Sequence, residues 1–152
     1  MTASRWFLLL SVALGIPVGI GAFTFGYAKG FSYLSSDPRA CINCHVMNDT
    51  YDAWRKSGHR HVAVCVDCHL PHTGLAKWVA KADTGFRHSA AFTLQNFKEP
   101  LEITPRDRRI VLANCLRCHA DLVQAIHTGG AANDGEVNCL HCHATAGHGA
   151  GG

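Results

Sequence analysis

No cysteine in this sequence lies outside one repeated pattern. The 152 residues contain eight cysteines, and all eight belong to four copies of C-x-x-C-H, at residues 41–45, 65–69, 115–119 and 139–143. A disulfide framework explains this poorly, because a two-residue spacing repeated four times does not close long loops. Zinc sites also use paired C-x-x-C motifs, but they need no histidine directly after each second cysteine. Every pair here has one.

Histidine directly after C-x-x-C is the attachment signature of c-type haem. The two thiols form thioethers with the porphyrin vinyl groups, and the adjacent histidine reaches the iron from one face. Four copies predict four covalently bound haem c groups, attached at Cys41, Cys44, Cys65, Cys68, Cys115, Cys118, Cys139 and Cys142.

Charge is absent from the 23 residues 6–28. As a helix this stretch would be about 34 Å long, against a bilayer hydrocarbon core of about 30 Å. A cleaved signal peptide also begins with a short basic region, here Arg5, but its apolar stretch is shorter, and residues 19–22 form only a weak cleavage site. We therefore expect an uncleaved membrane anchor over residues 1–30, with the span at about 6–28, and a haem domain over residues 31–152.

The chain has little room for an ordinary protein core. Four haems in 152 residues amount to one haem per 38 residues, so the porphyrins would supply much of the apolar interior. We expect a mainly α fold, with one N-terminal transmembrane helix, a small multihaem cytochrome c domain and little or no sheet. The formal charge of +3 is more than offset by eight ionised haem propionates, so it gives no support for nucleic-acid binding.

The expected orientation of the chain in the membrane follows from the chemistry of haem attachment more than from the flanking charges. Arg5 and Lys29 flank the apolar stretch on opposite sides, so the positive-inside signal is nearly balanced. Covalent haem attachment in bacteria takes place outside the cytoplasmic membrane, which predicts a periplasmic haem domain. Cys41 follows the span by about 13 residues, so membrane lipid lies close to the first haem and a lipid-soluble reductant can reach it.

Low-spin haem irons need second axial ligands, and few candidates exist. Met47 follows His45 by two residues, and methionine ligation raises haem potential, so the two side chains compete for the first iron. Met47 as a packing residue is the alternative. His59 or His61 is expected to be a distal ligand. His148 can cap a neighbouring haem, although its glycine-rich surroundings also fit a disordered tail.

One predicted helix covers residues 73–97, where apolar residues recur at helical spacing. Lys81 and His88 lie on another face of this helix. That face is either a solvated basic surface beside packed haem or a polar site near the first haem and the membrane.

A second helix is predicted after a polar linker at residues 98–104. Thr104 is a good N-cap and Pro105 suits the first helical position, so this helix runs towards Cys115. Residues 129–136 have the composition of an exposed loop.

Taken together, these features resemble the NapC/NirT family of membrane-anchored tetrahaem quinol dehydrogenases. The resemblance covers nearly the whole chain: the anchor, residues 33–38 leading into the first motif at 41–48, then His59, three further motifs and the late His148. It is much more specific than four haem motifs alone.

The resemblance implies a ligand for each haem. Met47 takes the first iron in place of His45, His59 is distal on haem four, and His148 is distal on haem three. Haem two is expected to take a lysine from a catalytic partner subunit. The proximal ligands of haems two, three and four are His69, His119 and His143. No role is implied for His61, His72, His127 or His141.

The resemblance also implies a quinol pocket beside haem one. The family has a lysine at the position of Lys81 and an acidic residue at that of His88, where this sequence departs from the pattern. His88 can accept a quinol proton, since histidine has an unperturbed pKa near 6.5, or can be the sixth ligand of the first iron. Asp83 is a nearby carboxylate but lies on a different helix face.

The activity implied is oxidation of menaquinol at the bacterial cytoplasmic membrane and electron transfer through four haems to a partner. That partner is the catalytic subunit of a pentahaem cytochrome c nitrite reductase, which itself reduces nitrite. Two alternatives are a donor to periplasmic nitrate reductase or several reductases, and a passive multihaem electron carrier without quinol chemistry.

Overall fold

The computed structural model describes residues 3–126 and 138–149, and these residues form helices and no strand. The predicted loop at 129–136 and His127 lie outside this description. The mainly α prediction is confirmed. The α-helices are α1 Ala3–Tyr27, α2 Asn48–Lys56, α3 Cys65–His69, α4 Gly74–Leu94, α5 Pro105–Ile126 and α6 Cys139–Cys142. The 3-10 helices are η1 Gly30–Leu34, η2 Pro38–Asn43, η3 His45–Met47 and η4 Gly58–His61.

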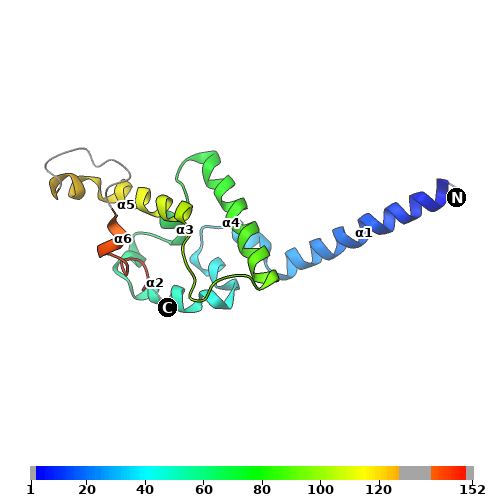
Figure 1. Ribbon diagram of the computed structural model, residues 1–152, viewed down its shortest axis with the longest axis horizontal. Coiled ribbons are helices and arrows are strands. Elements are labelled where there is room, and N and C mark those ends of the chain that lie inside the picture. The colour runs from blue at the N-terminus through cyan, green and yellow to red at the C-terminus, as the bar shows by residue number, and fades with distance from the viewer. Residues whose placement is uncertain (1–2, 127–137, 150–152) are drawn as a thin grey trace.

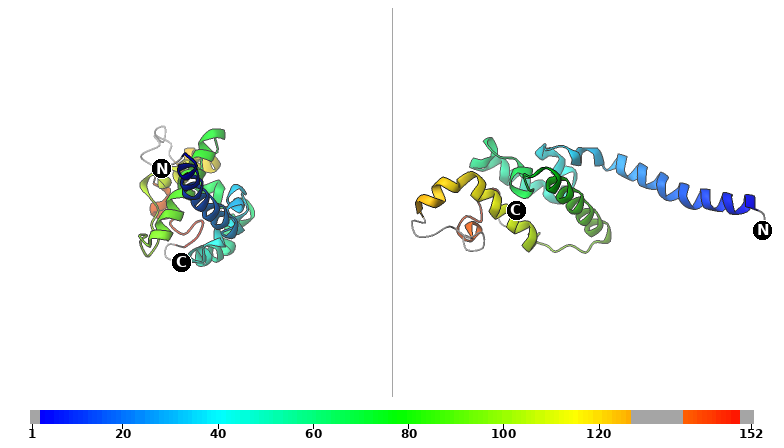
Figure 2. Two further views of the ribbon diagram at one scale, coloured as in Figure 1. Left: turned by 90° about the vertical axis from the view of Figure 1, so that its right-hand side faces the viewer. Right: turned by 90° about the horizontal axis from the view of Figure 1, so that it is seen from above.

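Helix α1 projects away from the other helices as a long arm (Figures 1 and 2). Its segment Ser4–Tyr27 is long and apolar enough to cross a membrane, and its large apolar side chains are exposed. The helix ends one residue before the predicted end of the span. Lys29 adopts a left-handed conformation with φ 53°, which turns the backbone into η1.

The segment after α1 is held close to the first haem motif. Gly30 lies against the ring of Phe25, where any side chain would collide with the aromatic carbons. The amide of Asn43, inside the first motif, donates a hydrogen bond to the hydroxyl of Ser32 at 2.6 Å. The first motif therefore sits directly beside the end of the apolar helix, as its position in the sequence predicted.

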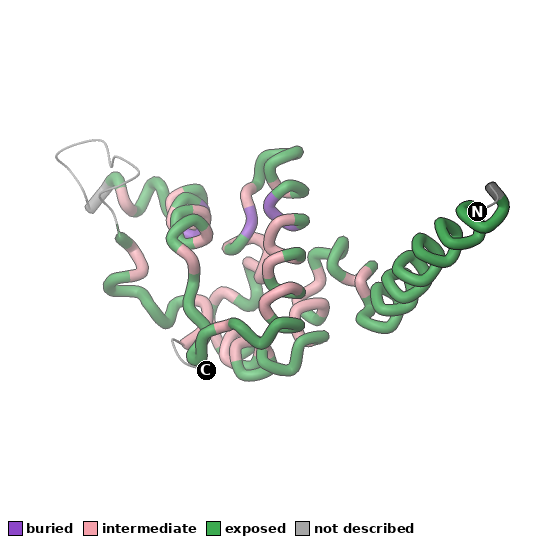
Figure 3. Tube along the Cα trace, turned by 45° about the vertical axis from the view of Figure 1, so that its right-hand side comes forward, coloured by how far each residue is buried: buried purple, intermediate pink, exposed green. Residues whose placement is uncertain are grey.

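The remaining helices form a folded part with very little protein core. Within the described residues, only three apolar side chains are buried, at Leu70, Ala80 and Val111. Figure 3 shows buried residues only in short patches on a mostly exposed trace. This agrees with the expectation that the polypeptide alone supplies little of the apolar interior.

One of the few buried polar side chains joins α5 to α3. Asn114 is 8% exposed, and its amide donates to the carbonyl oxygens of Cys68 and Leu70, both at 2.9 Å. Cys68 belongs to the second motif and Cys115 follows Asn114 directly. The two hydrogen bonds therefore fix the second and third motifs relative to each other.

Helix α5 begins as the sequence predicted. Thr104 accepts a hydrogen bond from the backbone N–H of Asp107 and donates to its carboxylate at 2.6 Å, which satisfies a free amide of the first turn. Helix α4 is shorter than predicted, because Gln95 turns into the left-handed region at φ 54° and ends it.

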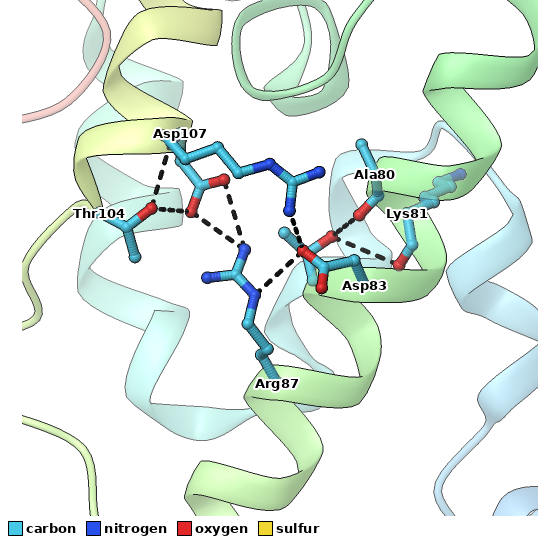
Figure 4. Close-up of polar contacts among 8 residues, drawn as sticks. Ala80, Lys81, Asp83, Arg87, Thr104 and Asp107 are labelled. Carbon is cyan, nitrogen blue, oxygen red and sulfur yellow. Dashed lines mark hydrogen bonds and ion pairs between the residues drawn. The ribbon is translucent and has the colours of Figure 1, made fainter.

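Ion pairs tie α4 to the start of α5 (Figure 4). The Arg87 guanidinium contacts the carboxylates of Asp83 at 3.1 Å and Asp107 at 3.3 Å. Arg106 of α5 reaches back to Asp83. Asp107 has a pKa below its usual range, because Thr104 and the nearby arginines favour its charged form over the cost of burial.

We predict that Asn114→Ala destabilises the folded chain by about 2 kcal/mol, since two buried carbonyl oxygens lose their donor. The measurement is chemical unfolding of the full chain in detergent, followed by its visible spectrum. Arg109→Ala, at an exposed position of the same helix, is the control and should change stability by less than about 0.5 kcal/mol. Equal effects of the two substitutions would contradict the role given to Asn114.

Candidate haem-binding sites

Motifs two, three and four share one local geometry. In each, the cysteines occupy consecutive turns of a helix, in α3, α5 and α6, so both thiols project from one face. The histidine comes where the helix stops or bends. His69 is the last residue of α3, while His119 and His143 both have φ −112° and leave helical geometry.

The first motif has a different backbone. It is divided between η2 and η3 by Cys44, which is extended at φ −97° and ψ 113°. The turn leaves His45 exposed and Met47 partly buried. The spatial relation of thiols and histidine found in the other motifs is therefore not reproduced here, and Met47 is the less exposed of the two candidate ligands.

The motifs follow one another in space in the order of the chain. The Cys41 thiol of the first motif interacts directly with Cys65 of the second, which lowers the pKa of Cys41. Burial raises the pKa of Cys68, and so does the charge of nearby Cys118 in the third motif. Cys115 is likewise affected by Cys139 of the fourth motif. Groups attached at these positions would form a continuous series.

Two pairs of histidine rings lie close to each other. The ring centres of His59 and His119 are 6.2 Å apart, and those of His69 and His148 are 6.0 Å apart. A metal–imidazole bond is about 2 Å long and a ring nitrogen lies about 1 Å from the ring centre, so two axial histidines on one metal have centres about 6 Å apart. The ring-centre distances of both pairs are close to that value.

These ring neighbours belong to other motifs than the haem partners that the family resemblance implied. His59 was expected beside His143 and lies beside His119, while His148 was expected beside His119 and lies beside His69. The carbonyl oxygen of Ala146 lies 2.9 Å from His59 Nδ1, so the chain end contacts His59 two residues before His148.

The same contact defines which nitrogen of His59 is available to a metal. Because a carbonyl oxygen can only accept, His59 Nδ1 carries the hydrogen and donates to Ala146. In the neutral imidazole, Nε2 then has the free lone pair. Metal-binding histidines almost always donate their other ring N–H in this way, so the local chemistry of His59 fits axial ligation of a haem iron.

Other histidines have different contacts. His72 Nε2 lies 2.9 Å from the Asp67 carbonyl and 3.0 Å from Arg117, bridging the second and third motifs. His61 accepts a hydrogen bond from Arg60, and His141 lies exposed within α6. No group of three or more metal-binding side chains converges within residues 3–126 and 138–149, whereas a zinc interpretation requires four ligands at one point.

Lys81 lies beside the first motif but is committed to backbone contacts. It is 6% exposed, and its ammonium donates to the carbonyls of Leu34 at 3.0 Å and Ser35 at 2.7 Å. It also lies 5.5 Å from the ring centre of Trp78. Burial lowers the pKa of Lys81, with the nearby charge of Lys77 acting in the same direction. Lys81 thus holds residues 28–35, which follow α1 and form the membrane-exit segment, against α4.

Tyr33 is a site residue to which the sequence pattern assigned no role of its own. Its ring packs against Gly85, where an added Cβ would lie 3.0 Å from a ring carbon. Its hydroxyl bonds to Thr84, and burial raises the pKa of Tyr33, as do the charges of Cys41 and Cys44. A glycine within the predicted helix, between Lys81 and His88, was the signal that could have revealed this close approach.

His88 lies on the same face of α4, two turns beyond Lys81. Its ring is solvent-accessible, yet neighbouring protein atoms crowd it, and desolvation lowers its pKa, followed by the charge of Arg87. It is close enough to His69 for their charges to interact. Tyr33 therefore stands between Lys81 at the first motif and His88 near the second.

An apolar helix leading directly into haem-attachment motifs defines a membrane-anchored c-type cytochrome. The chain belongs to the NapC/NirT cytochrome c family, whose N-terminal region matches residues 1–150. Proteins of this family carry covalently bound haem c.

Two curated relatives cover most of the chain. Cytochrome c-type protein NrfH of Wolinella succinogenes is 38% identical, with 98% of this chain and 90% of the relative covered. Cytochrome c nitrite reductase subunit NrfH of Nitratidesulfovibrio vulgaris is 31% identical, with 88% and 80% covered.

The structure also resembles a chain in the crystal structure of the cytochrome c nitrite reductase NrfHA complex bound to the inhibitor HQNO. The TM-score is 0.62 at 29% identity, and the match covers 91% of this chain and 87% of the other. The likeness therefore extends over both the anchor and the haem motifs.

We predict that Lys81→Met loosens the segment after η1, since the carbonyls of Leu34 and Ser35 lose a buried donor. Hydrogen exchange of residues 32–37 should accelerate, by a factor corresponding to about 1–3 kcal/mol. Mass spectrometry of the detergent-solubilised chain measures it. Lys77→Met, one turn earlier on α4, is the control and should leave this exchange unchanged. Unaltered exchange in Lys81→Met would show that these hydrogen bonds are not needed.

Proposed function

We propose that this chain oxidises menaquinol at the surface of the bacterial cytoplasmic membrane and delivers the electrons to the catalytic subunit of a pentahaem cytochrome c nitrite reductase. Residues 1–30 would form the anchor and residues 31–152 a periplasmic haem domain. The relatives named NrfH and the NrfHA complex support the assignment to a nitrite reductase system.

One observation carries the quinol part of the proposal. The hydrogen bond from Asn43 to Ser32 joins the first haem motif to the segment that directly follows the apolar helix. Lys81 holds the next residues of that segment, Leu34 and Ser35, against α4. A donor dissolved in the bilayer therefore meets the first motif before any other. Tyr33 adds a hydroxyl beside this motif, at the water-exposed end of the anchor.

Four haem c groups, when bound, supply a series of one-electron centres. The chain would hold them by its eight motif cysteines, with Met47 as a ligand in the first motif and His69, His119 and His143 in the others. His59 and His148 would supply further ligands to these groups. The order of the motifs in space, from Cys41 to Cys139, supports a path that leads away from the membrane.

Lys81 and His88 of α4, together with Tyr33 of η1, would carry out the quinol chemistry. Lys81 uses two of its three ammonium N–H donors on the backbone of the membrane-exit segment and would offer the third to a headgroup oxygen. Tyr33 would orient the headgroup by hydrogen bonding. His88 is the proton acceptor, a role that requires the neutral imidazole. Crowding and the charge of Arg87 lower the pKa of His88, so the neutral form persists at neutral pH.

The direct test uses the full chain in lipid nanodiscs, with its haems oxidised at the start. A menaquinol analogue should reduce the haems within seconds, and a quinone-site inhibitor such as HQNO should prevent this. Haems that respond to dithionite but not to the quinol would overturn the proposal. Copurification with a pentahaem nitrite reductase tests the partner, and association with a nitrate reductase alone would contradict it.

We predict that quinol-dependent haem reduction slows as pH falls through the lowered pKa of His88, below about 6.5, since protonation removes the base. The rate is measured by stopped flow between pH 5 and 8. His88→Gln should be slower and lose this pH dependence. His88→Asp should move the decline to lower pH, because a carboxylic acid titrates lower. A pH profile that is unchanged in His88→Gln would exclude His88 as the acceptor.

A further inference from the structure

One face of α4 carries a row of apolar side chains that stays exposed in the part of the chain that the structure describes. Leu75, Val79 and Phe86 recur at helical spacing and so lie on one face. They are 80%, 54% and 75% exposed. The buried residues of this helix, Ala80 and Lys81, lie on the other side. A contiguous exposed apolar face is typical of an interaction surface.

Haem groups attached at the motifs would lie on the packed side of α4 and leave this face uncovered. On one flank of the helix, Lys81 and Gly85 contact the segment that leads into the first motif, Gly85 through the ring of Tyr33. On the other flank, the ion pair of Arg87 with Asp107 joins α4 to α5, which carries the third motif. The apolar face therefore points away from the motifs.

Helix α4 lies next to the point where the chain would leave the membrane. Lys81 donates to the carbonyls of Leu34 and Ser35, which follow α1 by only a few residues. Figures 1 and 2 show α4 at the side of the folded part from which α1 projects, running across the direction of α1. Phe31 and Leu34 of η1 are also exposed, so apolar surface continues from α1 towards α4.

We propose that the apolar face of α4 rests on the lipid bilayer, with Leu75, Val79 and Phe86 at the boundary between headgroups and acyl chains. A helix with one apolar face, lying across the anchor, buries that face in the interface. Trp78, half exposed at the edge of the same face, is a residue type enriched at this boundary. The inference rests on α1 spanning the membrane, and neither on quinol oxidation nor on the identity of the partner.

The experiment is photo-crosslinking of the full-length haem-loaded chain in nanodiscs of phosphatidylethanolamine and phosphatidylglycerol. The photoreactive amino acid benzoylphenylalanine replaces Val79 or Phe86, both exposed, so packing within the chain is preserved. Phe7 of α1 is the positive control. The matched control is Leu122, which is apolar and 59% exposed but belongs to α5, on the side away from α1 (Figure 1). We expect lipid adducts at positions 79 and 86 several-fold above those at 122, identified by mass spectrometry.

Other results would overturn the proposal. Adducts to an added pentahaem nitrite reductase, in place of lipid, would make this face a protein-docking surface. Adducts between two copies of the chain would make it a dimer interface. Lipid adducts no more abundant than at position 122 would place the face in water. The visible spectrum of each variant reports its haem content, and replacement of Leu75 on the same face serves if one variant fails to fold. No quinol is involved, so failure of quinol oxidation would leave this result unaffected.

Discussion

Facing imidazole rings are the constraint on which the rest of this structure depends. His59 with His119 and His69 with His148 bring together segments far apart in the sequence, at the separation that one iron would impose. Helices stop or bend at the motif histidines, and the bond from His59 to Ala146 positions the chain end.

Such a constraint matters because the polypeptide has little else to hold it together. Leu70, Ala80 and Val111 are the only buried apolar residues in the part of the chain that the structure describes. Hydrogen bonds from buried polar side chains therefore hold the helices together. Asn114 joins the second and third motifs, and Lys81 joins α4 to the membrane-exit segment. Both use buried donors that satisfy backbone carbonyls, which are costly to leave unpaired.

The sequence predicted those features that depend on local pattern. The apolar helix, the helix over most of residues 73–97 and the Thr104 cap follow from composition, spacing and capping chemistry. The pairing of histidines was not predictable from spacing, because it depends on how distant segments meet. Family resemblance gave a different pairing. The extended backbone at Cys44 and the contact of Tyr33 with Gly85 were missed for the same reason, since both arise from tertiary packing.

Covalent attachment of four haems to a chain that keeps its anchor is the central claim, and intact-mass measurement of the protein extracted from membranes tests it most directly. The account predicts the mass of the polypeptide with residues 1–30 retained, plus four haem groups that survive denaturation. A mass with fewer haems, or one lacking the N-terminal segment, would contradict it.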